Sequence, residues 1–226
     1  YATELVQLPA TCPAVTEMPA HDQQLLDILE KTGSKKLARR RKEGQRLLRE
    51  NGATHNVFDP DDASRNWQFD PVPLIIGHEE WSTIERGLIQ RAELLNLILA
   101  DIYGPRSLLE KGLLPAELVY CHKGFLWPCV GMFPETAPRL VIYSGNMARG
   151  RDGRFWVLED RTQPPFGSGY ALENRIVMNR SFPRLFEGFQ VHRLSMYFRA
   201  LRNCLSQLAR HNREEPRVVV LTPGPE

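Results

Sequence analysis

The sequence predicts an α+β protein in which a helical N-terminal region packs with a small antiparallel β-hairpin, followed by the first strand of an α/β lobe. Three observations support this. Apolar residues recur at helical spacing in several segments, two strand-like runs flank an Asp-Gly turn, and a β-branched apolar run lies near the C-terminus. The 226 residues are 42% hydrophobic and 25% charged, which is typical of a globular chain able to bury a core.

The N-terminal part divides into an arm and a mostly helical region. Residues 1–22 contain three prolines and little periodicity, so we expect an extended arm there. Residues 23–138 are expected to be mostly helical. A first helix runs from Asp22 to the break at Gly33, and Ser34 is predicted to cap a second helix that stops at Asn51-Gly52.

The second helix, residues 34–50, is the most basic part of the chain. Residues 34–49 hold eight Lys or Arg and a single acid, Glu43. Such a helix can contact nucleic acid or an acidic partner, or it can simply present a solvated face. No aromatic residues interleave for base stacking, and the rest of the chain balances the charge, which argues against nucleic acid as a partner.

A long helix is expected in "WSTIERGLIQRAELLNLILADIYGP". Ser82 and Glu85 are predicted to form its capping box, and Gly104-Pro105 to end it. A short helix should follow at Ser107–Lys111. One apolar stripe assigns the long helix to the core: Ile84, Leu88, Ala92, Leu95, Ile98, Leu99 and Ile102.

Residues 139–215 are expected to hold a β-hairpin and further helices. The strands are predicted at 139–145 and 154–160, with a turn near Asp152-Gly153 and a cross-strand pair of Tyr143 with Trp156. Residues 176–182 and a long amphipathic segment beginning near 191 read as helices. "RVVVLTPGPE" then reads as a buried strand, so residues 216–226 are expected to begin a following α/β lobe and the natural polypeptide to continue.

The end of the hairpin is the strongest candidate for a metal site. Glu159 and Asp160 close the second strand, where alternation places their side chains on opposite faces, so one of them at most is expected to face a given site unless the strand bulges. Asn146 on the partner strand can supply a third oxygen. Hard cations such as Mg²⁺ prefer oxygen ligands of this kind.

The segment after the hairpin offers groups suited to an anion. Arg161 has a planar fork that fits phosphate or carboxylate, Gln163 has an amide, and Gly167 and Gly169 permit close backbone approach. Tyr170, Asn174 and Arg175 follow near an expected helix start, where anions are favoured. The competing interpretation is a polar strand end followed by an ordinary Pro/Gly-rich loop, since no complete phosphate-binding motif is present.

The cysteines and the hydropathy of the chain indicate in which cellular compartment the protein is expected. The four cysteines, Cys12, Cys121, Cys129 and Cys204, form no pair at metal-ligand spacing, so we expect buried free thiols in a cytoplasmic protein. No apolar run approaches the length of a membrane span, so no membrane partner is expected.

Several long segments resemble the circularly permuted ATP-grasp family, which is related to glutathionylspermidine synthetases. They are "VLEDRTQPPFGSGYALENR", "DPVPLIIGHEEWSTIERGLIQRAELLNLILADIYGP", "GLLPAELVY" and "RVVVLTPGPE". The resemblance covers roughly residues 35–226 and implies that the chain is the N-terminal part of an ATP-grasp-like fold. It also implies an enzyme that activates a carboxylate as an acyl phosphate with Mg²⁺ and ATP, then joins it to an amine. Small-molecule or peptide carboxylates and amines would be the substrates, and the rest of its own polypeptide a partner.

The resemblance also implies roles for the hairpin residues. The metal would be held by Asp160, Glu159 and Asn146, and the catalytic cations would be Arg161 and Arg175. Nucleotide contacts would come from Gln163, Gly167, Gly169, Tyr170 and Asn174.

This chain departs from the pattern that it resembles at three places near the hairpin. Many members of the family have an acid at the position of Asn146 and an asparagine at that of Arg161, and the usual Pro-Ser-Gly turn is Pro165-Phe166-Gly167 here. A second interpretation is therefore a non-catalytic binding or scaffold domain derived from the family, contacting an acidic partner through helix 34–50. On either view, residues 1–226 alone are expected to be inactive.

Overall fold

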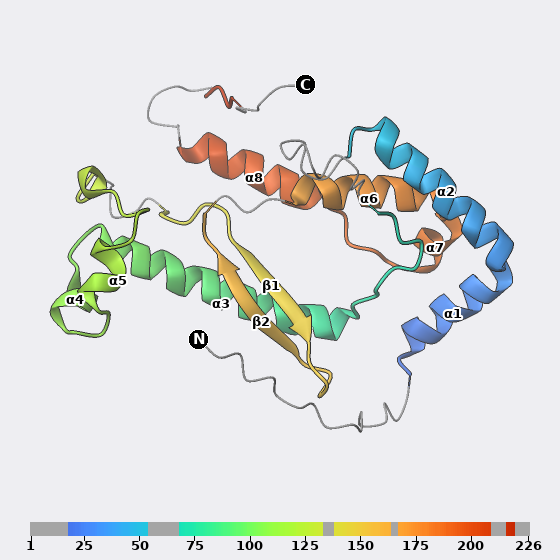
Figure 1. Cartoon of the computed structure of the whole chain (residues 1–226), viewed down its shortest axis with the longest axis horizontal. Helices are drawn as coiled ribbons and strands as arrows, with labels where there is room; N and C mark the ends of the chain where they lie inside the picture. Colours follow the sequence, from blue (N-terminus) through green and yellow to red (C-terminus); the bar gives the residue numbers. More distant parts are fainter. Residues whose placement is uncertain (1–17, 54–67, 133–137, 164–166, 209–215, 220–226) are drawn as a thin grey trace. The chain divides into compact units, whose positions relative to one another are not determined.

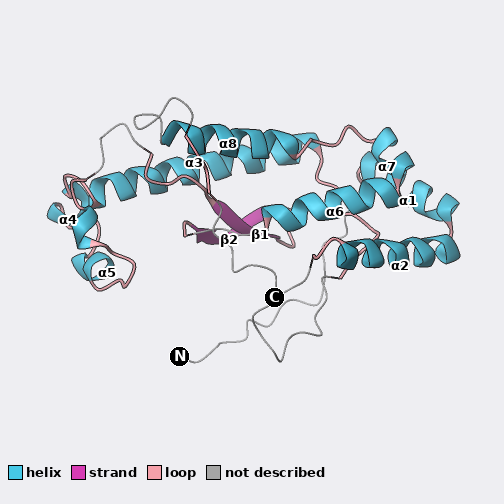
Figure 2. Cartoon of the chain, turned by 90° about the horizontal axis from the view of Figure 1, so that it is seen from above, coloured by secondary structure: helices cyan, strands magenta, loops and turns pink. Residues whose placement is uncertain are grey.

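The computed structural model describes residues 18–53, 68–132, 138–163, 167–208 and 216–219, and it confirms the α+β class (Figure 1). Within these ranges helices predominate, and the sheet is a two-stranded antiparallel hairpin (Figure 2). The helices are α1 (Ala20–Thr32), α2 (Ser34–Glu50), α3 (His78–Ile102), α4 (Ser107–Glu110), α5 (Ala116–Tyr120), the 3-10 helix η1 (Trp127–Cys129), α6 (Ser168–Ser181), α7 (Pro183–Gly188) and α8 (Ser195–Leu208). The strands are β1 (Ser144–Arg149) and β2 (Phe155–Arg161).

The chain divides into two compact units, and each is described separately below. Unit 1 comprises residues 1–85 and 144–190, and unit 2 comprises residues 86–143 and 191–226. Each unit is built from two segments that are far apart in the sequence. The boundary between residues 85 and 86 falls inside α3. The segment boundaries expected at residues 22, 138 and 215 remain predictions.

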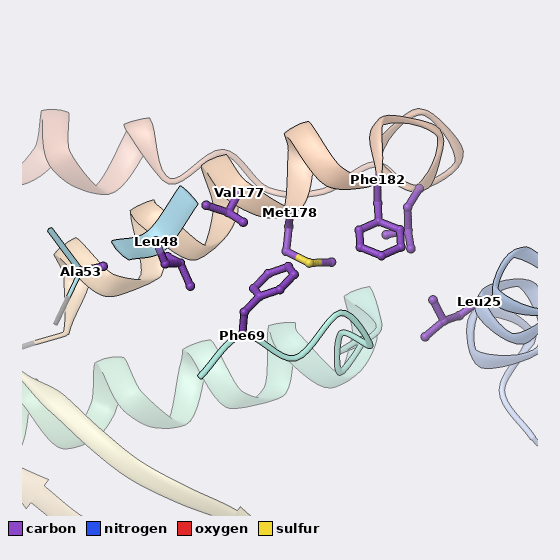
Figure 3. Packing of buried hydrophobic residues seen from close by; sticks show 8 residues of the cluster. Leu25, Leu48, Ala53, Phe69, Val177, Met178 and Phe182 are labelled. Carbon is purple, nitrogen blue, oxygen red and sulfur yellow. The ribbon is translucent and has the colours of Figure 1, made fainter. Parts of the chain in front are cut away.

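Unit 1 holds the main hydrophobic core, which lies between α1, α2, α6 and α7 (Figure 3). Leu48 and Val177 are fully buried, and Phe182 is 1% exposed. The guanidinium carbon of Arg40 lies 4.8 Å from the centre of the Phe182 ring, so its cation covers one face of this core residue. The other members are Leu25, Ala53, Phe69, Met178 and Leu185.

A close approach between α2 and the segment before α3 depends on Gly44. A Cβ atom at this position would lie 2.5 Å from the ring of Phe69, which is 3% exposed. The Phe69 backbone N–H donates to Gln45 Oε1 at 2.8 Å and holds the ring against the helix. A glycine is therefore required at this helical position by packing rather than by backbone conformation.

The hairpin has a different register from the predicted one. The first strand is Ser144–Arg149 rather than 139–145, and Trp156 pairs with Ala148, so the predicted Tyr143–Trp156 pair is wrong. The backbone N–H groups of Arg139 and Leu140 both donate to Asn96 Oδ1, at 2.8 and 2.9 Å, and so are not engaged in a β-ladder. The predicted turn is confirmed: Gly153 has a φ of 77°, and the Arg154 N–H donates to Asp152 Oδ1.

Two predicted helix caps are wrong. Gly33 rather than Ser34 occupies the N-cap position of α2, and its carbonyl accepts the Leu37 N–H at 3.0 Å. Helix α3 begins at His78, so Ser82 lies inside it and forms no capping box with Glu85. Gly77 accepts the Trp81 N–H at 2.8 Å, and Glu79 and Glu80 place negative charge in the first turn, which favours the earlier start.

The helices after the hairpin agree with prediction in type and differ in extent. Helix α6 begins at Ser168, earlier than the predicted 176, and it ends before Pro183 as expected. Helix α8 spans Ser195–Leu208 and is amphipathic as predicted. Apolar residues of this helix, and one just before it, are half-buried: Leu194, Phe198, Leu201, Leu205 and Leu208.

Unit 2 contains an aromatic cluster around the short helix α5. Tyr120 stacks on Trp127 with 4.8 Å between ring centres, and Tyr103 stacks on Phe125 at 5.2 Å. Trp127 remains 54% exposed. The described cysteines are free as predicted, but Cys121 is exposed and Cys129 and Cys204 are half-buried, so their predicted burial is wrong. Cys12 lies outside the described residues.

The structure describes residues 216–219 of the segment that was predicted to form a buried strand near the C-terminus, and these residues do not form a strand. Residues 216–219 adopt no regular structure, and Val218 and Val219 are 50% and 84% exposed. A buried strand needs hydrogen-bonding neighbours on both sides, and the described sheet consists of β1 and β2 alone. Residues 220–226 and the predicted arm up to residue 17 lie outside the described residues. Across the described ranges, we find no helix long and apolar enough to cross a bilayer.

Candidate functional site at the end of the hairpin

A β-bulge determines which side chains share a face at the end of the hairpin. Asn146 pairs with Glu159, whereas the next residue, Met147, pairs with Val157, so Leu158 is an extra residue in β2. Residues directly opposite in an antiparallel pair lie on the same face. Glu159 and Val157, two residues apart, therefore lie on opposite faces, which a regular strand does not allow.

The bulge brings together Asn146, Glu159 and Arg161, three of the residues singled out from the sequence. One carboxylate oxygen, Glu159 Oε2, accepts from Asn146 Nδ2 at 2.6 Å and from Arg161 Nε at 3.1 Å. The side chains of Glu159 and Arg161 are 53% and 38% exposed, so solvent reaches this cluster. We call these three residues the hairpin cluster.

Asp160 lies on the other face of the hairpin. Its partner across the ladder is Gly145, and this face also carries the Met147–Val157 pair, where the side chains are half-buried. The sequence argument that the two adjacent acids point in opposite directions agrees with this register. The expected metal-ligand set is thus divided: Asn146 and Glu159 on one face, Asp160 on the other.

The residues expected to contact a nucleotide occupy the loop after β2 and the first turns of α6. Gln163 is exposed, and Gly167 at the N-cap of α6 has a φ of 116°, a conformation that favours glycine. Gly169 lies in the first turn, where an added Cβ would meet no atom within 4 Å. Residues 164–166, which include the departure at Phe166, lie outside the described residues.

Farther along α6, the polar side chains have contacts inside unit 1. Tyr170 and Asn174 are half-buried and four residues apart, so they share one face of the helix. Arg175 lies over the ring of Phe186 in α7 at 5.5 Å, and burial lowers the pKa of its guanidinium. Glu173 Oε2 accepts from Asn51 Nδ2 at 2.7 Å, which links α6 to the end of α2. Arg161 thus belongs to the hairpin cluster, and Arg175 has a ring contact with α7.

The remaining described residues contain no alternative metal centre. No three His, Cys, Asp or Glu side chains come together in the described ranges. A cation at the hairpin cluster would have Glu159 and the amide oxygen of Asn146 as its ligands, and it would have to displace Arg161 Nε from the shared carboxylate oxygen.

One ion pair that supports the hairpin was not found from the sequence. Arg149 Nη2 donates to both carboxylate oxygens of Glu80, each at 2.8 Å, and the Arg149 guanidinium lies 5.0 Å from the ring centre of Phe155. The pair fixes β1 to the first turn of α3. The two residues are 69 positions apart, and no local pattern connects them.

The structure thus defines an α+β protein whose hairpin ends in a charged, hydrogen-bonded cluster followed by a helix N-terminus. The chain belongs to the circularly permuted ATP-grasp type 2 family, whose model matches residues 73–226, a range that includes the whole hairpin and α6. The resemblance stated from the sequence is therefore confirmed.

The relatives are bacterial proteins. An uncharacterised protein of Mycobacterium tuberculosis is 35% identical over 210 residues, which are 89% of this chain and 24% of that protein. An uncharacterised protein of Synechocystis is 38% identical over 174 residues, or 76% of this chain and 36% of that protein. A second mycobacterial protein is 37% identical over 168 residues, 74% of this chain and 30% of that protein. The chain therefore spans about a quarter to a third of the length of these relatives.

Proposed function

We propose that this chain contributes the hairpin cluster to an ATP-dependent carboxylate–amine ligase. The reaction would form an acyl phosphate on a substrate carboxylate with Mg-ATP, and an amine would then displace the phosphate. The observation that carries this proposal is the convergence of Asn146, Glu159 and Arg161 inside the range matched by the ATP-grasp family model.

The cluster suits a reaction in which negative charge must be held in place. A guanidinium can stabilise a phosphoryl oxygen without being consumed, and positioned donors lower the barrier because they need no rearrangement during the reaction. Mg²⁺, when bound, would neutralise phosphate charge. Glu159 and Asn146 are its proposed ligands on the face of the hairpin cluster, and Asp160, the third proposed ligand, lies on the other face and would have to reach the ion around the end of the strand. Arg161 and Arg175 remain the proposed catalytic cations, while Gln163, Gly167, Gly169, Tyr170 and Asn174 remain the proposed nucleotide contacts.

The test is nucleotide binding by the natural gene product that contains residues 1–226. In calorimetry with Mg²⁺ and a non-hydrolysable ATP analogue, we expect Asp160→Asn and Glu159→Gln each to weaken binding about tenfold, as for loss of a charge-assisted contact. Glu93→Gln is the matched control, because Glu93 is exposed on α3 in unit 2 and should leave binding unchanged. Absence of nucleotide binding by the unaltered gene product would contradict the proposal.

The same experiment separates a second candidate, a non-catalytic member of the family. The observation that favours it is that Glu159 already bonds the protein's own cation, Arg161. In that case, Asp160→Asn and Glu159→Gln would behave like the control.

A further inference from the structure

The exposed face of α2 carries a line of like charges. Lys35, Arg39, Lys42, Arg46 and Arg49 follow one another at alternating spacings of four and three residues, and all five are exposed. At 100° per residue they fall on one narrow side of the helix, and at 1.5 Å per residue the line is about 21 Å long. We call these five residues the cation stripe.

The stripe lies opposite the face that α2 uses for packing. Leu48 and Gly44 are buried, Leu37 packs against the core, and Arg40 covers the ring of Phe182. On the helical wheel these four positions centre about half a turn from the stripe. The core contacts of unit 1 therefore orient the stripe outward as a consequence of the fold.

The charges on the stripe are poorly compensated within the helix. Neighbouring cations three or four residues apart, such as Lys35 with Arg39 and Lys42 with Arg46, destabilise a helix. Within α2, Arg46 forms an ion pair with Glu50 at 3.2 Å. Solvated faces of globular proteins generally mix both signs. A line of cations alone is typical of a surface that meets negative charge on a partner.

The charge of the remaining chain argues that this partner is a protein rather than nucleic acid. Residues 34–50 contain 8 Lys or Arg and 2 Glu, so the other residues contain 29 − 8 = 21 cations and 27 − 2 = 25 acids, a net charge of −4. Nucleic-acid interfaces are broad and strongly basic, and they use aromatic residues where single strands stack. The stripe is one helix wide and carries no aromatic residue.

We propose that the cation stripe binds an acidic α-helix of a partner protein whose Asp or Glu residues repeat at the same alternating spacing. Two helices side by side would then pair carboxylates with the stripe over about four turns, and three of the five cations are arginines that can bind carboxylates in a bidentate manner. This proposal does not depend on the proposed ligase activity.

The test measures fluorescence anisotropy of a labelled helical peptide with glutamates at the matching positions. The comparison peptide has the same composition, but its glutamates are distributed around the helix. The protein is the natural gene product, unaltered or in two triple variants checked for helix content by circular dichroism. The stripe variant carries Lys35→Gln, Arg39→Gln and Lys42→Gln, and the control variant carries Lys111→Gln, Lys123→Gln and Arg202→Gln, three exposed cations of unit 2.

We expect the stripe variant to bind the matched peptide about tenfold more weakly and the control variant less than about twofold more weakly. The unaltered protein should prefer the matched peptide to the redistributed one, and its affinity should fall as salt rises. Equal losses in the two variants, or equal binding of the two peptides, would overturn the proposal. So would tighter binding to a short RNA duplex than to the matched peptide.

Discussion

At the scale of single residues, the structure distinguishes two helical glycines that look equivalent in the sequence. Gly44 lies in α2 against the ring of Phe69, whereas Gly87 lies in α3 with no atom within 4 Å of where a Cβ would be. Both have ordinary helical conformations, so alanine would improve the intrinsic helix propensity at either position by about 1 kcal/mol. Packing alone should make the two substitutions differ.

We expect Gly44→Ala to destabilise the protein by about 1–2 kcal/mol, because a methyl group 2.5 Å from a buried ring forces the core apart. Gly87→Ala, its matched control, should raise the free energy of unfolding by up to about 1 kcal/mol. Urea unfolding followed by circular dichroism would measure both. A stabilising Gly44→Ala would show that Phe69 is not held where the structure places it.

The hairpin cluster also belongs to the residue scale. Sequence alternation separates Glu159 from Asp160, but it does not reveal the bulge that places Glu159 opposite Asn146. The register shift at the bulge depends on pairing between two strands. No sequence pattern identifies Leu158 as the extra residue. The sequence alone identified the candidate ligands. Which of them lie on the same face of the hairpin became clear only from the register of β1 and β2.

At the scale of elements, the attachment of the hairpin to α3 rests on Arg149. The two-stranded sheet is too small to be stable by itself. Arg149 Nη2 donates to both carboxylate oxygens of Glu80 and so holds β1 to the helix, and the side chains of Arg149 and Glu80 are 40% and 30% exposed. Partial burial makes this pair stronger than a typical surface ion pair.

We expect Arg149→Lys to lower the free energy of unfolding by about 1 kcal/mol, because an ammonium group cannot reach Glu80 and also place a planar cation over the ring of Phe155. Arg154→Lys in the same hairpin provides the control. Its contact with Asp152 is long, at 3.9 Å, and the Arg154 side chain is 81% exposed, so the change should be within about 0.3 kcal/mol. Similar effects of the two substitutions in urea unfolding would contradict the role assigned to Glu80.

At the scale of the whole molecule, the buried apolar residues are unevenly distributed. Among the described residues, unit 1 contains Leu48, Phe69, Val177, Phe182 and their neighbours, whereas unit 2 contains Ile102 and Val119 as its buried hydrophobic residues. Regions with fewer buried contacts open at lower free energy. The two units should therefore differ in local stability.

Hydrogen–deuterium exchange should show this difference directly. We expect α2 and α6 to keep protection at urea concentrations where α8 and the unit 2 part of α3 have lost it. Leu48→Ala should cost about 2–5 kcal/mol in unit 1 because it leaves a cavity at a fully buried site. It should speed exchange in α6 more than in α8. Simultaneous loss of protection in all helices would indicate one cooperative unit instead.

The amino-acid sequence by itself determined the α+β class, the existence of most helices and the Asp152-Gly153 turn. It also determined that Glu159 and Asp160 lie on opposite faces of the strand and that the chain is a circularly permuted ATP-grasp protein. These follow from local preferences and periodicity, which are properties of short segments. Tertiary structure decided where β1 lies, which residue of β2 bulges, why Gly44 is required and what holds Arg149. It also showed that residues 216–219 do not form a strand. Pairing and packing join residues far apart in the chain, and no local pattern encodes the partner.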